Sequence, residues 1–153
     1  MKALYFLFIL VFTATLSFAQ APAAKVDFCG QQYELPAGAT LVSPYEVRGP
    51  GYDLILMYIN PADLRNGAPA EYTKQRVKKM KGKELQEISC FIQETPAKAF
   101  KFAYPTDKGL SYEMLAYGIT KGQPVMIQLT LEVDPYNNLE IPEFARQFVH
   151  FDK

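Results

Sequence analysis

The sequence is apolar without a break at residues 54–59, LILMYI, and this run restricts the fold more than any other segment. In a β-strand, successive side chains point to opposite faces, so Leu54 and Leu56 share one face while Ile55 and Met57 share the other. A strand that is apolar on both sides is covered on both sides. The run therefore predicts a strand in the centre of its sheet, ending before Pro61.

Several further segments show the alternation and the β-branched and aromatic residues that are typical of strands. The clearest is 97–105, where aromatic side chains alternate with lysine and alanine. The pattern predicts extended segments or strands at 26–36, 85–95, 97–105, 110–120 and 124–133, with the last two joined as a hairpin through KGQ. Clusters of glycine and proline predict mostly loop at 37–52 and a loop at 61–70.

Two segments have helical periodicity. Residues 69–85 begin at Pro69 and end near Gly82, which suits the first turn and the end of a helix. In 141–151 the apolar side chains recur three and four residues apart, at Ile141, Phe144, Ala145, Phe148 and Val149. We therefore expect a helix at 69–85 and a terminal helix at 141–151.

These elements predict one α+β domain over residues 26–153. We expect an antiparallel sheet of about six or seven strands with helices packed on its faces, and a C-terminal helix. The two-sided apolar run is the reason for placing helices on both faces.

The N-terminus has the three parts of a secretory signal peptide. Lys2 precedes an apolar run from Ala3 to Phe12, and the small residues Ser17 and Ala19 flank Phe18. We expect cleavage of residues 1–19 after Ala19, a disordered mature N-terminus at 20–25, and export to the periplasm or the medium. The alternative is a membrane anchor, but the run is shorter than the roughly 20 apolar residues of a spanning helix. We therefore expect no membrane span after cleavage.

The charge balance gives no support to nucleic-acid binding. The chain has 16 cations and 16 acids, and the signal peptide removes one cation and no acid, which leaves a net charge of −1.

Export bears on Cys29 and Cys90, the two cysteines of the chain. Disulfides persist in oxidising compartments, and a bridge over a loop of about 60 residues contributes about 4 kcal/mol in the chain-entropy model. The alternative is two free buried thiols, because cysteine is among the most buried residue types. Both possibilities stay open.

The sequence shows no motif for catalysis or for a cofactor. His150, the one histidine, lies near the end of the predicted terminal helix, where a cation is favoured, and is expected there as a helix-end residue. One histidine and two separated cysteines do not make a usual zinc site. RGPGYD has glycines but no following helix, so it does not predict a phosphate loop. We expect no enzyme activity, no metal and no cofactor.

A basic run is the first candidate site. Six cations fall within ten residues that contain no acid: Lys74, Arg76, Lys78, Lys79, Lys81 and Lys83. They could bind an acidic partner or anionic lipid headgroups. The alternative is a solvated helix face, since Glu71, Glu84 and Glu87 flank the run.

Aromatic side chains are the second candidate. Tyr104, Tyr112, Tyr117 and Tyr136 lie in or near the predicted hairpin and could line a pocket for an apolar ligand. The alternative is that they are ordinary half-buried strand residues.

The element order resembles the PsbP-like sandwich fold of PsbP, DcrB-type and LpqN-type proteins. The resemblance rests on YELPAG, the two-sided strand DLILMYI, the helix after it, the strand that ends at TPA before KAFKFAYP, the long hairpin, and the aromatic segment FARQFVHF. It covers residues 26–153 as a pattern of elements. It implies a six- or seven-stranded antiparallel sheet between helices and a role in binding proteins or small ligands, without enzyme chemistry.

The sequence therefore predicts an exported, non-catalytic envelope protein that acts as a protein-interaction module. The alternative is a carrier of a small apolar or lipid-like ligand.

Overall fold

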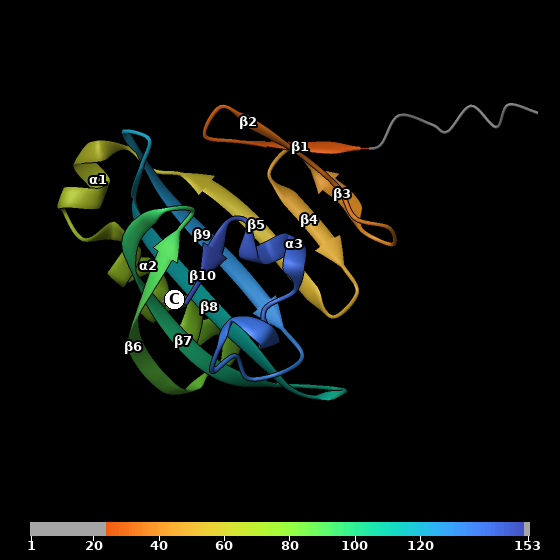
Figure 1. The fold of residues 1–153 in the computed structure, drawn as a ribbon. Coiled ribbons are helices and arrows are strands. Elements are labelled where there is room, and N and C mark those ends of the chain that lie inside the picture. Colours follow the sequence, from red (N-terminus) through yellow and green to blue (C-terminus); the bar gives the residue numbers. More distant parts are fainter. Residues whose placement is uncertain (1–23, 152–153) are drawn as a thin grey trace, which may run out of the picture.

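The computed structural model describes residues 24–151, and the predicted signal peptide lies outside them. Figure 1 shows the arrangement of the elements. The strands are β1 Lys25–Phe28, β2 Gln31–Glu34, β3 Thr40–Ser43, β4 Glu46–Gly49, β5 Tyr52–Tyr58, β6 Lys83–Ile92, β7 Thr95–Thr106, β8 Gly109–Thr120, β9 Gln123–Leu131 and β10 Val149–His150. The helices are α1 Pro61–Arg65, α2 Ala68–Met80, the short 3₁₀ helix η1 Asn138–Glu140 and α3 Glu143–Arg146.

Within the described residues, eight strands form one curled antiparallel sheet in the order β10-β6-β7-β8-β9-β5-β4-β3. Strands β1 and β2 form a separate hairpin. Strand β5 lies between β9 and β4, with Leu54 opposite Leu129 and Leu56 opposite Ile127. The prediction of an interior strand from the run at 54–59 is therefore confirmed.

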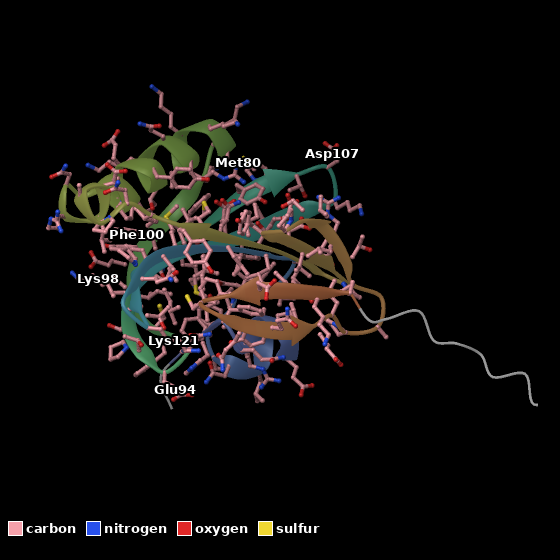
Figure 2. The ribbon with its side chains drawn as sticks, turned by 90° about the horizontal axis from the view of Figure 1, so that it is seen from above. Met80, Glu94, Lys98, Phe100, Asp107 and Lys121 are labelled. Atoms are coloured by element: carbon pink, nitrogen blue, oxygen red, sulfur yellow. The ribbon has the colours of Figure 1, made fainter. Side chains whose placement is uncertain are left out.

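The inner face of the curled sheet carries the main core. Leu54, Leu56, Ile127 and Leu129 are each at most 1% exposed. The β1–β2 hairpin and the C-terminal segment cover them, and Figure 2 shows both on the side of the sheet away from α2. The hairpin and the C-terminal segment contact each other through aromatic rings, since the ring centroids of Phe28 and Phe148 lie 5.7 Å apart. The side chains that fill this face come from segments spread along the described chain, from β1 to the C-terminal segment.

The outer face carries a smaller cluster under α2. Phe102, Tyr104 and Leu115 are buried there, and Val77 and Met80 of α2 pack against them. Gly82 follows this contact, and a Cβ atom at that position would lie 2.6 Å from the Phe102 ring. A glycine is therefore needed where the chain leaves α2 and enters β6.

The predicted fold class is wrong. Strands make up 53% and helices 20% of the described residues, and the helices are short, so the fold is a curled sheet and not an α+β layer with helices packed on its faces. The segment 37–52 was expected to be loop but contains β3 and β4, and 61–70 contains α1. Both strands are four residues long and lie between turn residues such as Pro44 and Pro50, so the turns obscured the strands.

The predicted terminal helix at 141–151 is also wrong. Helix α3 has four residues, and Val149 then pairs with Ile92 at the edge of the sheet. The apolar side chains are buried as their spacing suggests, including Phe144 and Phe148. Val149 and His150 have an extended backbone because they pair with Ile92 and Phe91 of β6. The β-branched side chain of Val149 also suits a strand.

Candidate functional site

Helix α2 presents the predicted basic run. The helix begins after Gly67, which has a left-handed φ of 79°, and ends at Met80, before Lys81 with a left-handed φ of 55°. Thr73 faces the sheet, where its hydroxyl donates a hydrogen bond to the Pro69 carbonyl oxygen at 2.8 Å. The face turned to the sheet is therefore fixed by packing, and the opposite face carries the cations.

Arg76 is separated from the other cations by its contact with Glu113 of β8. Its Nε donates to Glu113 Oε1 at 2.8 Å, and its Nη2 donates to Oε2 at 2.9 Å. The Glu113 side chain is 0% exposed, and the hydrogen bonding to it raises the pKa of the Arg76 guanidinium. Arg76 therefore neutralises a buried carboxylate and holds α2 on the sheet.

The remaining five cations are exposed, and we call them the basic cluster: Lys74, Lys78, Lys79, Lys81 and Lys83. None of them forms an ion pair with another residue of the described chain. Several lie in the last turn of α2 or just beyond it, where the helix dipole favours positive charge. The structure thus leaves five of the six predicted cations exposed and without an ion pair among the described residues.

An apolar surface adjoins the first half of the same helix. Two neighbouring grooves, with volumes of 460 Å³ and 310 Å³, share Met57 and Tyr58. We call six of the apolar side chains that line them the apolar strip: Tyr45, Ile55, Met57, Tyr58, Tyr72 and Met126. Ile55 and Met57 are the outward side chains of β5, and they remain half-buried. The covering expected on both sides of β5 is therefore incomplete on the outer side.

The predicted aromatic pocket residues are not brought together. Tyr104 is buried on the outer face, and Tyr117 stacks there on Phe100 with the ring centroids 5.9 Å apart. Tyr112 lies opposite Leu131 in the inner register. Tyr136 is 73% exposed, and the Lys101 ammonium lies 4.3 Å from its ring centroid. The four rings thus occupy different faces of the sheet.

Cys29 and Cys90 are both free and buried. Cys29 is in the β1–β2 turn with a left-handed φ of 50°, and its backbone N–H donates to the Tyr58 hydroxyl oxygen at 2.8 Å. Burial raises the pKa of the Cys29 thiol, and it raises the pKa of the Cys90 thiol to about 12. Both residues belong to the inner core, and the disulfide between them stays a prediction.

The sequence did not identify a polar pocket at one end of the sheet. Turns between β6 and β7 and between β8 and β9 meet β2 and the segment from α3 to β10 there. His150 is part of its wall and stacks on Phe91, instead of ending a helix as expected. The residues that line the pocket are far apart in the sequence, so no sequence motif could have revealed them.

Residues 24–151 contain no group of three or more histidine, cysteine, aspartate or glutamate side chains placed to hold a metal ion. Across the same residues, no helix is long and apolar enough to cross a bilayer.

Comparison of the chain with protein-family models, curated proteins and solved structures found no match. The resemblance to the PsbP-like fold therefore stays a prediction. The proposals below rest on the geometry of the chain itself.

Proposed function

We propose that this chain is an exported, non-catalytic interaction module that binds an acidic protein segment across α2 and β5. The observation that carries the proposal is the exposed basic cluster, which runs from the middle of α2 to the start of β6, together with the half-covered apolar strip at the first half of α2. A central strand with apolar side chains on both faces calls for cover on both, and the chain supplies it fully on the inner face alone.

The apolar strip supplies contact area. On the outer side, Tyr72 of α2 is 38% exposed and Ile55 and Met57 of β5 are half-buried, so a partner could remove apolar surface from water there. Such burial contributes about 25 cal/mol per Å². Tyrosine is also enriched at protein interfaces, because its ring is apolar and its hydroxyl finds a hydrogen-bond partner.

The basic cluster supplies orientation and speed of association. Five exposed ammonium groups attract an acidic surface over distances of about a Debye length, which is about 8 Å at physiological ionic strength. Exposed charges change association rates and partner choice more than final affinity. The partner class that fits both features is a protein segment in which acidic residues adjoin apolar ones.

Site-specific photo-crosslinking in the native host tests this proposal. Benzoylphenylalanine would replace Tyr45 in the apolar strip or Lys78 in the basic cluster. A matched control would place it at Leu139, which is 88% exposed in the C-terminal segment, on the side of the sheet away from α2. We expect one adduct of the same added mass from positions 45 and 78 and not from position 139. Equal labelling at all three positions, or no protein adduct at 45 and 78, would overturn the proposal.

A further inference from the structure

The polar pocket at the end of the sheet is assembled from four separate parts of the chain. Its volume is 360 Å³, and it lies where the β6–β7 and β8–β9 turns approach β2 and the segment from α3 to β10. Figure 2 shows Glu94 and Lys121, one from each turn, at the same end of the molecule. The pocket shares no lining residue with the basic cluster or with the apolar strip.

A hydrogen-bond network fixes one wall of this pocket. The Gln93 amide nitrogen donates to the Tyr33 hydroxyl oxygen at 2.6 Å, and the Thr120 hydroxyl donates to Gln93 Oε1 at 3.2 Å. His150 of β10 lies against the β6–β7 turn, with Nε2 2.8 Å from the Gln93 carbonyl oxygen and Nδ1 2.9 Å from the Phe151 carbonyl oxygen. These side chains already use one another as partners, so the wall is held in place before any ligand enters.

Two cations of the pocket have no such partner within the described chain. The Nε atom of Arg146 is buried and forms no hydrogen bond there. Lys121 lines the same pocket and forms no ion pair among residues 24–151. A buried guanidinium N–H without an acceptor is unfavourable. Against these two cations the lining includes one acid, Glu94.

We propose that this pocket binds a small oxyanion, a carboxylate or phosphate group, with Arg146 and Lys121 as its binding residues. The planar guanidinium presents paired N–H donors that match two oxygens of such a group, and the lysine ammonium adds a point charge. The volume of 360 Å³ suits a small organic anion. The inference is independent of the partner proposed for α2 and β5.

Amide chemical-shift titration of the purified, exported chain tests it. One arm adds inorganic phosphate and the other adds succinate, each at constant ionic strength, so that the arms distinguish the two sources of the oxyanion. We expect saturable shifts at the two turns, around Gln93 and Lys121, in at least one arm. Saturation in the phosphate arm alone identifies a phosphate group, and saturation in the succinate arm alone identifies a carboxylate. Absence of saturable shifts at these turns in both arms would overturn the proposal.

Variants supply the second part of the test. Arg146→Gln should weaken binding about tenfold or more, because one charge-assisted hydrogen-bond pair is lost. Lys121→Gln is at an exposed turn position, so it should weaken binding several-fold while the fold stays intact, and it serves if Arg146→Gln unfolds. Arg65→Gln, on the exposed surface of α1, is the matched control and should leave binding unchanged. Equal loss in Arg65→Gln and Lys121→Gln would show general charge screening in place of a site.

Discussion

At the residue scale, Arg76 shows why a charge pattern in the sequence does not reveal which charges are free. It belongs to the basic run by position, yet its guanidinium pairs with a fully buried carboxylate on β8. The run as a sequence could not distinguish it from Lys78, because the partner is 37 residues away. The interaction assigns Arg76 to stability and the remaining lysines to the surface.

We predict that Arg76→Gln destabilises the fold by about 3 kcal/mol. Removing one partner of a buried pair typically costs about 3–5 kcal/mol, and we expect the lower end because 22% of the Arg76 side chain is exposed. Urea unfolding measures the effect. Lys78→Gln, on the same helix but exposed, should change the free energy of unfolding by less than about 0.5 kcal/mol. Equal stability of the two variants would show that Glu113 does not depend on Arg76.

Cys90 gives a second prediction at this scale. Its pKa of about 12, against 9.0 for a free thiol, leaves almost no thiolate at pH 8, so alkylation of the folded chain should be slow. As pH rises past 9, the Cys90 thiol ionises in the unfolded chain before it ionises in the folded chain. The contribution of the raised pKa to the free energy of unfolding is therefore fully present below pH 9 and is lost as pH rises toward 12. Alkylation kinetics before and after denaturation measure the protection, and fast labelling of Cys90 in the folded chain would contradict it.

The same experiment, done without reductant on denatured protein, decides the predicted disulfide. Two reactive thiols per chain would match the free cysteines of the structure. A count of zero reactive thiols per chain would establish the bridge between Cys29 and Cys90 that the exported location favours.

At the element scale, the C-terminal segment shows that burial and backbone conformation are separate pieces of information. Its apolar spacing predicted which side chains are buried, and Phe144, Phe148 and Val149 are indeed core residues. The spacing did not predict the backbone conformation, because Val149 and His150 pair with the edge of β6 and form a strand. Tertiary pairing of this kind is absent from a local pattern.

We predict that Phe148→Ala destabilises the fold by about 3–5 kcal/mol. Phe148 is 0% exposed, and its ring contacts those of Phe28, Tyr33 and Phe144, so its loss would uncouple the C-terminal segment from the β1–β2 hairpin. Thermal and urea unfolding check this prediction. Leu139→Ala is the control, since Leu139 is 88% exposed and should contribute little. If Phe148→Ala and Leu139→Ala have the same free energy of unfolding, the C-terminal segment is dispensable for stability.

At the scale of the whole molecule, the sequence predicted the interior strand β5, helix α2 and the long β8–β9 hairpin. It failed for β3, β4 and the fold class, because four-residue strands between glycine and proline turns carry little periodic signal. Of the candidate site, the run of cations at 74–83 could be read from the local sequence, but the pairing of Arg76 could not. The apolar strip and the pocket with Arg146 could not, since strand register and turn placement create them.

Export is the remaining prediction from the sequence. Cleavage after Ala19 should give a mature chain that begins at Gln20. N-terminal sequencing of the exported protein measures it, and an intact N-terminus at Met1 would contradict it.

Native mass spectrometry of the exported chain, purified from its own host, tests the central claim most directly. We predict a complex of the chain with one acidic protein, lost in Lys74→Glu/Lys78→Glu/Lys81→Glu and retained in Arg65→Gln, with the charge-reversed chain still folded. A chain that carries a small apolar molecule and no protein would instead favour the carrier. A protein complex that survives the triple charge reversal would contradict the role assigned to the basic cluster.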